Sequence, residues 1–288
     1  MENVCPAAKQ SLFYFALSSI MFVISFFSAS VLGYTSELWA LTYWGPALYF
    51  CLLNFILRYF LKGFTYEVAT RAALLGSVFA TGLYFATFDN SFHIFGLYAM
   101  AISMFHFSEF FTVALTNPQT LTVDSFILNH SSQYWIAAVT SWLEAGVEYY
   151  FFPSMKSYFW LSHIGVVMCI VGELFRKVAM FTAKTNFNHH VQTVKKPDHR
   201  LVTNGVYSLC RHPSYVGWFY WSIGTQIILL NPVCVVIYTL VSWMFFNERI
   251  FAEEMFLISF FGKQYLEYQK RVSTGLPFIK GVVMDGVS

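Results

Sequence analysis

A histidine, an arginine and several aromatic residues gather where a polar loop turns into an apolar segment, over residues 205–221. Pro213 stands at the junction. Proline fits the first turn of a helix, because its missing N–H would be unpaired there and its φ is already helical. We therefore predict a helix that begins at Pro213. The free N–H groups of its first turn would lie beside Tyr207, Arg211 and His212, where they could bind an anionic or electron-rich group.

Four clusters of polar residues lie in the last third of the chain. They are Gln192, the segment from His199 to Tyr207, the segment from Arg211 to Tyr215, and Arg249 with Glu253 and Glu254. A helical hairpin after Pro213 would return the fourth cluster to the same end as the third. The sequence thus predicts a pocket lined by His, Tyr, Arg and Glu side chains at that end of the hairpin.

The composition, with 57% apolar and 11% charged residues, indicates an integral membrane protein, because a soluble domain usually carries about 25% charge. A formal net charge of +2 gives no reason to expect a nucleic-acid partner. The five cysteines, among them Cys210 in the junction segment, lie far apart without a pairing rhythm. We expect them to be reduced thiols.

Apolar runs of about 18–25 residues are long enough to cross a hydrocarbon core of about 30 Å. We predict such helices at residues 12–33, 39–61, 71–88, 92–115, 134–152 and 158–182. Two further segments, 213–230 and 233–246, are joined only by Asn231-Pro232, which predicts an antiparallel hairpin. From Phe251 to Arg271 the helical alternation of apolar and charged residues predicts an amphipathic surface helix.

The expected fold is an all-α integral membrane protein with about eight transmembrane helices, including a tight C-terminal helical hairpin, plus a cytosolic amphipathic C-terminal helix. With eight crossings, nearly all basic residues fall on one side and only Lys156 falls opposite. Since basic residues are retained on the cytoplasmic side, the polar loop 183–212 and the C-terminal segment would face the cytosol. We divide the chain into N-terminal transmembrane helices, residues 1–152, and a C-terminal catalytic region, residues 153–288.

Ionisable residues also fall within the apolar segments. His106 and Glu109 are three apart and are expected to form a hydrogen-bonded pair that locks helix packing, since further metal ligands are not evident. Glu148 and its neighbour Glu144 are expected near the membrane interface. Glu173 and Arg176 can pair with each other or rim the cytosolic cavity, and structural pairing is the preferred interpretation.

The C-terminal motifs resemble those of the isoprenylcysteine carboxyl methyltransferases, membrane enzymes that methyl-esterify the C-terminal carboxylate of prenylated CaaX proteins. The resemblance is strongest over about residues 186–281. It is carried by Arg211-His-Pro-Ser-Tyr-Val-Gly-Trp-Phe-Tyr-Trp221 and by the tail Tyr265-Leu-Glu-Tyr-x-x-Arg271-Val-x-Thr-Gly-Leu-Pro277-Phe-Ile. One departure is the segment 247–254, which is less acidic than the family pattern leads us to expect, although its arginine and both C-terminal glutamates are present.

By that resemblance S-adenosylmethionine is the methyl donor, Arg249 holds the substrate, and Arg249 and Glu253 are the catalytic residues. The implied donor-binding residues are Gln192, His199, Arg200, Leu201, Val202, Tyr207, His212, Pro213, Ser214, Tyr215 and Glu253. The residue types suit these roles. Glu253 matches the α-amino group of the donor, helix-start N–H groups with His212 match its α-carboxylate, and the planar fork of Arg249 matches the substrate carboxylate.

The resemblance also implies a multi-pass endoplasmic reticulum protein with its active site facing the cytosol. Its implied partners are membrane lipid and farnesylated or geranylgeranylated CaaX proteins such as small GTPases, with no metal and no nucleic acid. Because a C-terminal carboxylate with a pKa of about 3.5 is already ionised at neutral pH, no general base is required.

Three alternatives stay open at this point. A phospholipid methyltransferase would need a base to deprotonate its amine, and an NADPH-dependent membrane sterol reductase would need a nicotinamide site, for which the sequence has no Rossmann-type glycine motif. A transporter or scaffold would be expected to have internal repeats or charged residues along a transmembrane path.

Overall fold

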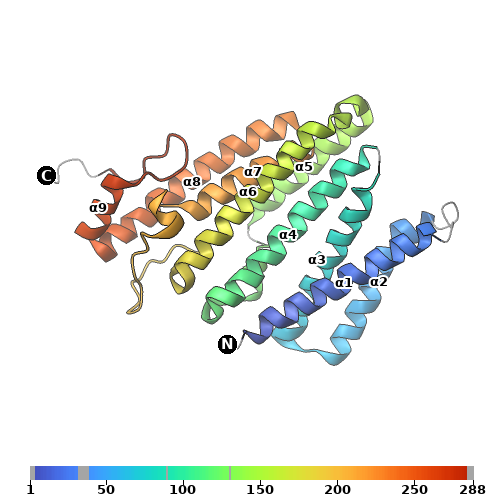
Figure 1. Cartoon of the computed structure of the whole chain (residues 1–288), viewed down its shortest axis with the longest axis horizontal. Helices are drawn as coiled ribbons and strands as arrows, with labels where there is room; N and C mark the ends of the chain where they lie inside the picture. Colours follow the sequence, from blue (N-terminus) through green and yellow to red (C-terminus); the bar gives the residue numbers. More distant parts are fainter. Residues whose placement is uncertain (1–3, 32–38, 89, 130, 284–288) are drawn as a thin grey trace. The chain divides into compact units, whose positions relative to one another are not determined.

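The structure, a computed structural model, describes residues 4–31, 39–88, 90–129 and 131–283, with the backbone alone for 27–31 and 39–47. Its regular elements in these ranges are all helices (Figure 1). The α-helices are α1 (Pro6–Val31), α2 (Trp39–Phe60), α3 (Gly63–Phe85), α4 (Phe92–Thr116), α5 (Ser132–Phe151), α6 (Phe159–Ala183), α7 (Pro213–Ile228), α8 (Pro232–Phe261) and α9 (Lys263–Arg271). The predicted end of the first helix at residue 33 lies outside the described residues.

Short 3-10 helices complete the connections: η1 (Pro118–Thr120), η2 (Val123–Phe126), η3 (Pro153–Ser157), η4 (Lys184–Asn186) and η5 (Gly205–Ser208). The chain forms two compact units. The first is Met1–His163 with Ile228–Leu230, and the second is Ile164–Ile227 with Asn231–Ser288.

In the first unit α3 packs against α1 and α4 (Figure 1). Stacked rings fill the core, with Phe15 and Phe107 centroids 4.0 Å apart. Polar side chains join the helices directly, since Ser18 and Ser77 hydroxyls lie 2.8 Å apart and Ser103 Oγ donates to the Leu75 carbonyl at 2.5 Å. Small and hydroxyl-bearing residues of this kind are typical of contacts between helices in a membrane.

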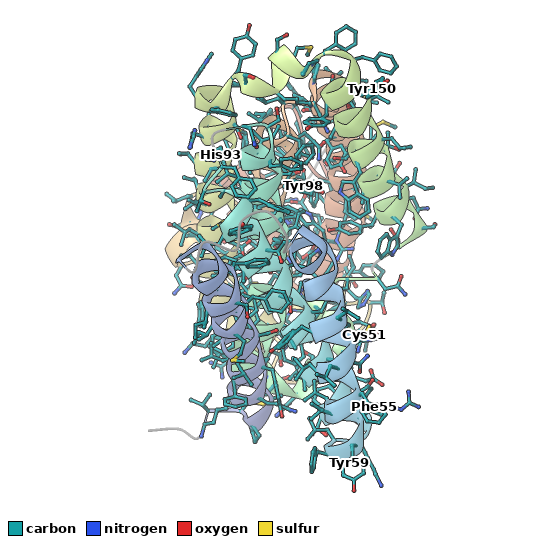
Figure 2. The ribbon with its side chains drawn as sticks, turned by 90° about the vertical axis from the view of Figure 1, so that its right-hand side faces the viewer. Cys51, Phe55, Tyr59, His93, Tyr98 and Tyr150 are labelled. Atoms are coloured by element: carbon teal, nitrogen blue, oxygen red, sulfur yellow. The ribbon has the colours of Figure 1, made fainter. Side chains whose placement is uncertain are left out.

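The outer side of α2 is apolar. Cys51, Phe55 and Tyr59, spaced four residues apart, lie along one side of this helix in Figure 2, and the side chains of Phe55 and Tyr59 are 74% and 77% exposed. Such a surface suits contact with lipid rather than water. Four helical stretches in the described ranges are long and apolar enough to cross a membrane, namely Pro6–Phe26, Gly63–Phe85, Phe92–Thr116 and Pro232–Phe261.

Two of the ionisable residues of the apolar segments have well-defined partners in the first unit. His106 donates from Nδ1 to the Phe126 carbonyl at 2.8 Å and accepts at Nε2 from the Tyr134 hydroxyl at 3.0 Å. Glu148, in the last turn of α5, forms an ion pair at 2.6 Å with Lys156. Lys156 is fully buried, and it also donates to the carbonyls of Leu229 and Leu230 at 2.7 and 3.1 Å. The lysine expected alone on the opposite side of the membrane is therefore a buried partner of Glu148.

In the second unit α6 and α7 touch through their backbones. A Cβ on Gly172 would meet the Gly217 carbonyl at 2.6 Å, and one on Gly217 would meet the Gly172 carbonyl at 2.5 Å. Only glycine permits this approach at both positions. The start of α7 at Pro213 confirms the sequence prediction.

Residues from the start to the middle of α7 contact the middle of α8. Phe219 and Ile223 share a buried cluster with Phe246 and Ile250, and the ring centroids of Tyr215 and Phe246 are 5.2 Å apart. Proline opens α8 as well, at Pro232, as predicted. These contacts align one end of α7 with the polar second half of α8.

The apolar segment 233–246 is the first part of a longer helix, because α8 runs from Pro232 to Phe261. The polar residues after 246 stay helical because the protein itself supplies partners for Arg249, Glu253 and Glu254. The separate amphipathic helix predicted for 251–271 is shorter than expected: residues 251–261 belong to α8, and only α9 is a helix of its own. The break falls at Gly262, whose φ of 52° and ψ of −128° end α8.

Residues 272–282, here called the C-terminal strap, follow α9. Leu276 and Ile279 of the strap are buried in the cluster between α7 and α8. Trp243 Nε1 of α8 donates to the Pro277 carbonyl at 2.8 Å. The strap therefore runs back along α8 after the end of α9.

Candidate functional site

A pocket lies in the second unit between the loop that follows α6, the second half of α8, and α9. Its lining residues are Ala183, Asn186, Asn188, His190, Gln192, His199, Arg200, Leu201, Val202, Tyr207, Arg211, His212, Glu253, Phe256, Leu257, Phe260, Tyr265 and Tyr268. Polar side chains and backbone come mainly from the loop, whereas α8 contributes an apolar wall. The pocket thus combines hydrogen-bonding groups with an apolar surface, as small-molecule sites commonly do.

The loop is fastened to the end of α8. Lys195 Nζ donates to the Phe260 carbonyl at 2.6 Å and lies 4.6 Å from the ring centroid of Phe261. The His199 ring packs against both phenyl rings, with centroids 5.7 and 5.3 Å away. A lysine at a helix C-terminus pairs with the exposed carbonyls there. These contacts set the loop across one side of the pocket.

Arg249 and Glu253 project from one face of α8, because they are four residues apart. The Tyr215 hydroxyl joins them, since it donates to Glu253 Oε2 and accepts from Arg249 Nε at 2.9 Å. Arg249 also donates to the His189 carbonyl, and its guanidinium lies 5.4 Å from the Tyr215 ring centroid. Glu253 lines the pocket, so the chain of bonds leads from the pocket to Arg249.

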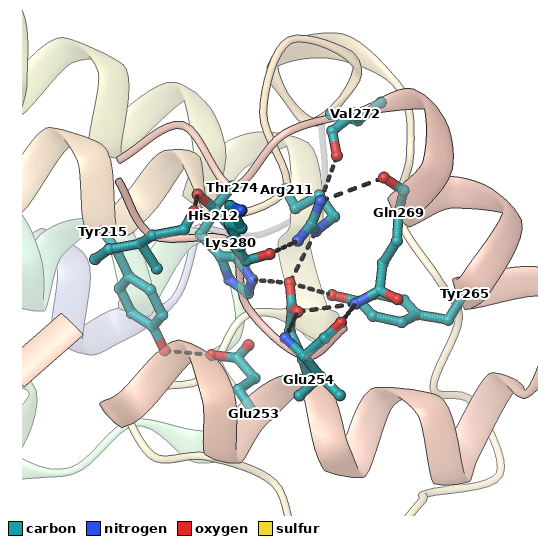
Figure 3. Close-up of polar contacts among 12 residues, drawn as sticks. Arg211, His212, Tyr215, Glu253, Glu254, Tyr265, Gln269, Val272, Thr274 and Lys280 are labelled. Atoms are coloured by element: carbon teal, nitrogen blue, oxygen red, sulfur yellow. Dashed lines mark hydrogen bonds and ion pairs between the residues drawn. The ribbon is translucent and has the colours of Figure 1, made fainter. Parts of the chain in front are cut away.

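Glu254 is the centre of a second network, behind the pocket wall (Figure 3). Its side chain is fully buried. Arg211 Nε and His212 Nε2 lie 2.8 and 3.0 Å from its Oε1, and Tyr265 donates to the same oxygen at 3.0 Å. Oε2 accepts from Gln269 Nε2 and from the Val282 N–H, both at 2.8 Å.

Arg211 ties the same network to the C-terminal strap. It donates to the carbonyls of Val272 and Lys280, the latter at 2.9 Å. Its own backbone N–H donates to the Ser273 carbonyl at 2.8 Å, and that of His212 donates to the Thr274 carbonyl at 3.2 Å. The Arg-His pair before α7 is therefore held by backbone of the strap as well as by Glu254.

Burial tunes the titrating groups of the loop. It lowers the pKa of His199, with Lys195 acting in the same direction, so the ring is neutral at pH 7. Burial and, second, the charge of Glu253 raise the pKa of Tyr207 far above 10, which keeps its hydroxyl protonated as a donor. Burial raises the pKa of Cys210 to about 11. The Cys210 thiol is thus protonated at neutral pH and is a poor nucleophile.

Arg176 of α6 reaches the first turn of α7. It donates from Nη1 to the Ser214 hydroxyl at 2.6 Å, and its guanidinium lies 4.8 Å from the ring centroid of Trp218. Glu173, expected beside it, forms an ion pair at 3.0 Å with Lys177. In the part of the chain that the structure describes, no group of three His, Cys, Asp or Glu side chains is placed to hold a metal ion.

The structure brings most of the predicted site residues together. Those that line the pocket are Gln192, His199, Arg200, Leu201, Val202, Tyr207, His212 and Glu253. Pro213, Ser214, Tyr215 and Arg249 are not among the lining residues, although Tyr215 bonds to Glu253 and Arg249 bonds to Tyr215.

Several lining residues were missed from the sequence. Phe256, Leu257 and Phe260 follow Glu253 at three, four and seven residues, the spacing of one helix face. That spacing could have revealed them once α8 was recognised as continuous beyond 246. Asn186 ends the short helix η4, and Asn188 and His190 lie on irregular backbone, where no periodicity indicates which side chains turn inward.

Residues 165–259 match the model of the isoprenylcysteine carboxyl methyltransferase (ICMT) family. Over longer stretches the chain is similar to proteins named protein-S-isoprenylcysteine O-methyltransferase. The one from Tribolium castaneum is 50% identical over 96% of this chain and 98% of its own length. The one from Homo sapiens is 52% identical over 84% of this chain and 85% of its own length.

The fold is similar to a solved structure of the eukaryotic intramembrane Ras methyltransferase ICMT, with a TM-score of 0.92 at 49% sequence identity. The match covers 96% of this chain and 99% of the solved chain. Nearly the whole chain therefore shares the fold of that solved structure.

Proposed function

This chain belongs to the isoprenylcysteine carboxyl methyltransferase family, and from that premise we propose that it methylates the C-terminal prenylcysteine carboxylate of prenylated CaaX proteins. The methyl donor is S-adenosylmethionine. The acceptors are farnesylated or geranylgeranylated proteins such as small GTPases. The observation that carries the proposal is the bonded chain Glu253–Tyr215–Arg249, which links the pocket to an arginine able to hold a carboxylate.

The residues of the pocket fit the donor. Glu253 offers a carboxylate for its α-amino group, and the His212 ring, which also lines the pocket, faces its α-carboxylate. Leu201, Leu257 and Phe260 offer apolar surfaces for its adenine ring. S-adenosylmethionine supplies a methyl group on a positively charged sulfur, which a carboxylate can attack directly.

Arg249 holds the acceptor. Its side chain is anchored through Nε to Tyr215 and through one terminal nitrogen to the His189 carbonyl, which fixes the plane of the guanidinium. A planar guanidinium binds a carboxylate through parallel hydrogen bonds, which a lysine cannot reproduce. Arg249 thus orients the carboxylate oxygen without neutralising it by proton transfer.

Catalysis consists of alignment and exclusion of water. The carboxylate is already ionised at neutral pH, so the chain needs no general base. Holding two reactants in line can supply about 7–11 kcal/mol of the barrier reduction. Since opposite charges are neutralised as the methyl group moves, the apolar wall formed by Phe256, Leu257 and Phe260 favours the reaction by keeping water away.

The proposed topology has eight crossings, with α7 and α8 as a hairpin, α9 on the cytosolic surface, and the pocket open to the cytosol. The membrane is that of the endoplasmic reticulum, and the catalytic region begins near residue 153. The position of the basic residues supports this orientation. In it, the prenyl chain of the acceptor can stay in the lipid while its carboxylate reaches Arg249.

The test is methyl transfer from labelled S-adenosylmethionine to N-acetyl-farnesylcysteine by membranes that carry the chain. Arg249→Ala is expected to abolish transfer while the melting temperature stays within a few degrees of the native value. Arg271→Ala is the matched control, because Arg271 is exposed and bonds to the Glu267 carbonyl of its own helix; it should keep the native rate. If Arg249→Ala keeps the native rate and affinity for the acceptor, the assignment of that residue is wrong.

A further inference from the structure

Phe278 occupies an unusual position in the C-terminal strap. Its side chain is 94% exposed and its φ is +62°. L-residues avoid this left-handed region, and for a bulky residue it is a genuine exception. The neighbouring Leu276 and Ile279 are buried in the protein. The turn therefore holds a phenyl ring outward while its neighbours anchor the backbone inward.

The turn lies beside the apolar part of α8. Pro277 accepts a hydrogen bond from the Trp243 side chain at 2.8 Å. Trp243 precedes Asn247 by four residues, which is about 6 Å along the helix on its apolar side. Leu240 and Met244, on either side of Trp243, are each 58% exposed. α8 itself is long and apolar enough to cross a membrane.

The backbone of the strap is prepared for a medium without water. Irregular backbone at membrane depth requires that its polar groups be paired within the protein. Most carbonyls of the strap accept bonds from protein donors, at Val272, Ser273, Thr274, Leu276, Pro277, Ile279 and Lys280. The pairing of these carbonyls lowers the cost of placing that part of the backbone in a medium without water.

We propose that the turn Leu276–Ile279 re-enters the membrane from the cytosolic side and that the Phe278 ring packs among the acyl chains of membrane lipids. Acyl chains are the occupant because the exposed side chains of α8 next to the turn form the lipid-facing surface of a helix that crosses the membrane. Lys280, which follows the turn, can keep its ammonium group at the polar surface while its stem lies along apolar neighbours.

This contact bears on the pocket. Thr274 accepts from the His212 N–H and Lys280 accepts from the Arg211 guanidinium, so the two ends of the re-entrant turn hold the residues that precede α7. A strap seated in lipid fixes Arg211 and His212 from behind. Phe278 is thus a membrane anchor of the pocket wall rather than a member of the pocket.

The test uses the full chain in phosphatidylcholine vesicles, with one residue at a time replaced by photoreactive benzoylphenylalanine. Phe278 is compared with Leu240, the lipid-facing reference on α8, and with Val194, an apolar side chain of the polar loop that is 74% exposed. After irradiation, mass spectrometry of the peptides identifies adducts. We expect lipid adducts at position 278, as at position 240, and no lipid adducts at position 194.

Absence of a lipid adduct at 278 while 240 is labelled would overturn the proposal. A crosslink between two chains at 278 would overturn it in favour of a second copy as the occupant, and an adduct only when prenylcysteine is added would overturn it in favour of the substrate. As a second measurement, Phe278→Asp is expected to lower the melting temperature in vesicles and Phe278→Leu to preserve it. Equal melting temperatures for these two variants would also refute the contact with acyl chains.

Discussion

Replacing Glu254 by glutamine keeps the size of the side chain but removes its negative charge. In the folded protein that charge lies 2.8 Å from Arg211 and 3.0 Å from the His212 ring, with the glutamate side chain fully buried. Breaking a buried ion pair by removing one partner costs about 3–5 kcal/mol, because the other charge is left buried without compensation. Arg211 keeps its bonds to the carbonyls of Val272 and Lys280, so we expect the lower end of that range.

The assay is thermal unfolding of the purified variants, followed by binding of S-adenosylmethionine. A loss of about 3 kcal/mol corresponds to a fall in Tm of about 6–12 °C for a chain near this size. Glu253→Gln is the matched control, because it makes the same change one residue earlier at a side chain that lines the pocket. It should weaken donor binding with little change in Tm.

The two glutamates therefore separate two roles. In the proposed function, Glu254 is a positioning residue behind the wall, and Glu253 is expected to touch the donor. A Glu254→Gln variant that melts with the native protein would refute the reasoning about the buried charge. Equal losses of Tm and of donor affinity in both variants would refute the division of roles.

Three further predictions concern other parts of the chain. Lys156→Met should destabilise the protein by about 3–5 kcal/mol in thermal melts because it strands the buried Glu148 charge; adding Glu148→Leu should recover part of that loss, and no recovery would contradict the pairing. Gly217→Val should abolish the folded peak in gel filtration, because its side chain would overlap an α6 carbonyl, whereas Gly146→Ala, which adds a methyl group in open space, should be neutral. Unfolding at rising pH should show stability falling above about pH 10, the usual tyrosine pKa, because burial raises the pKa of Tyr207 and keeps it protonated only in the folded state; Tyr207→Phe should reduce that fall, and an unchanged slope would contradict it.

The helix starts at Pro213 and Pro232 were predictable because proline acts locally, through a fixed φ and a missing N–H. The length of α8 was not. Its apolar run ends at Phe246, and Asn247 with the charges after it resembles a helix leaving the lipid. The helix continues because residues distant in sequence, such as Tyr215 for Arg249 and Glu253, supply partners that no local pattern reveals.

The candidate site likewise has a part that the sequence indicated and a part that it did not. Residue types and their resemblance to a known family indicated the loop and glutamate side of the pocket, and eight of the implied donor-binding residues do line it. That they bind the donor stays a prediction. The role of Glu254 and of the C-terminal strap could not be found from the sequence, because it depends on contacts such as Arg211 with Lys280, which are 69 residues apart.

The break between α8 and α9 carries one more consequence. At Gly262 a Cβ would meet nothing within 4 Å, yet φ is 52° and ψ is −128°. The backbone angles therefore disfavour L-amino acids, although there is space for a side chain. Even L-alanine would be strained at these angles. D-alanine would be relaxed, because its φ and ψ here mirror those of an extended L-residue. Natural variation at this joint is thus limited by chirality alone, with ample room around it.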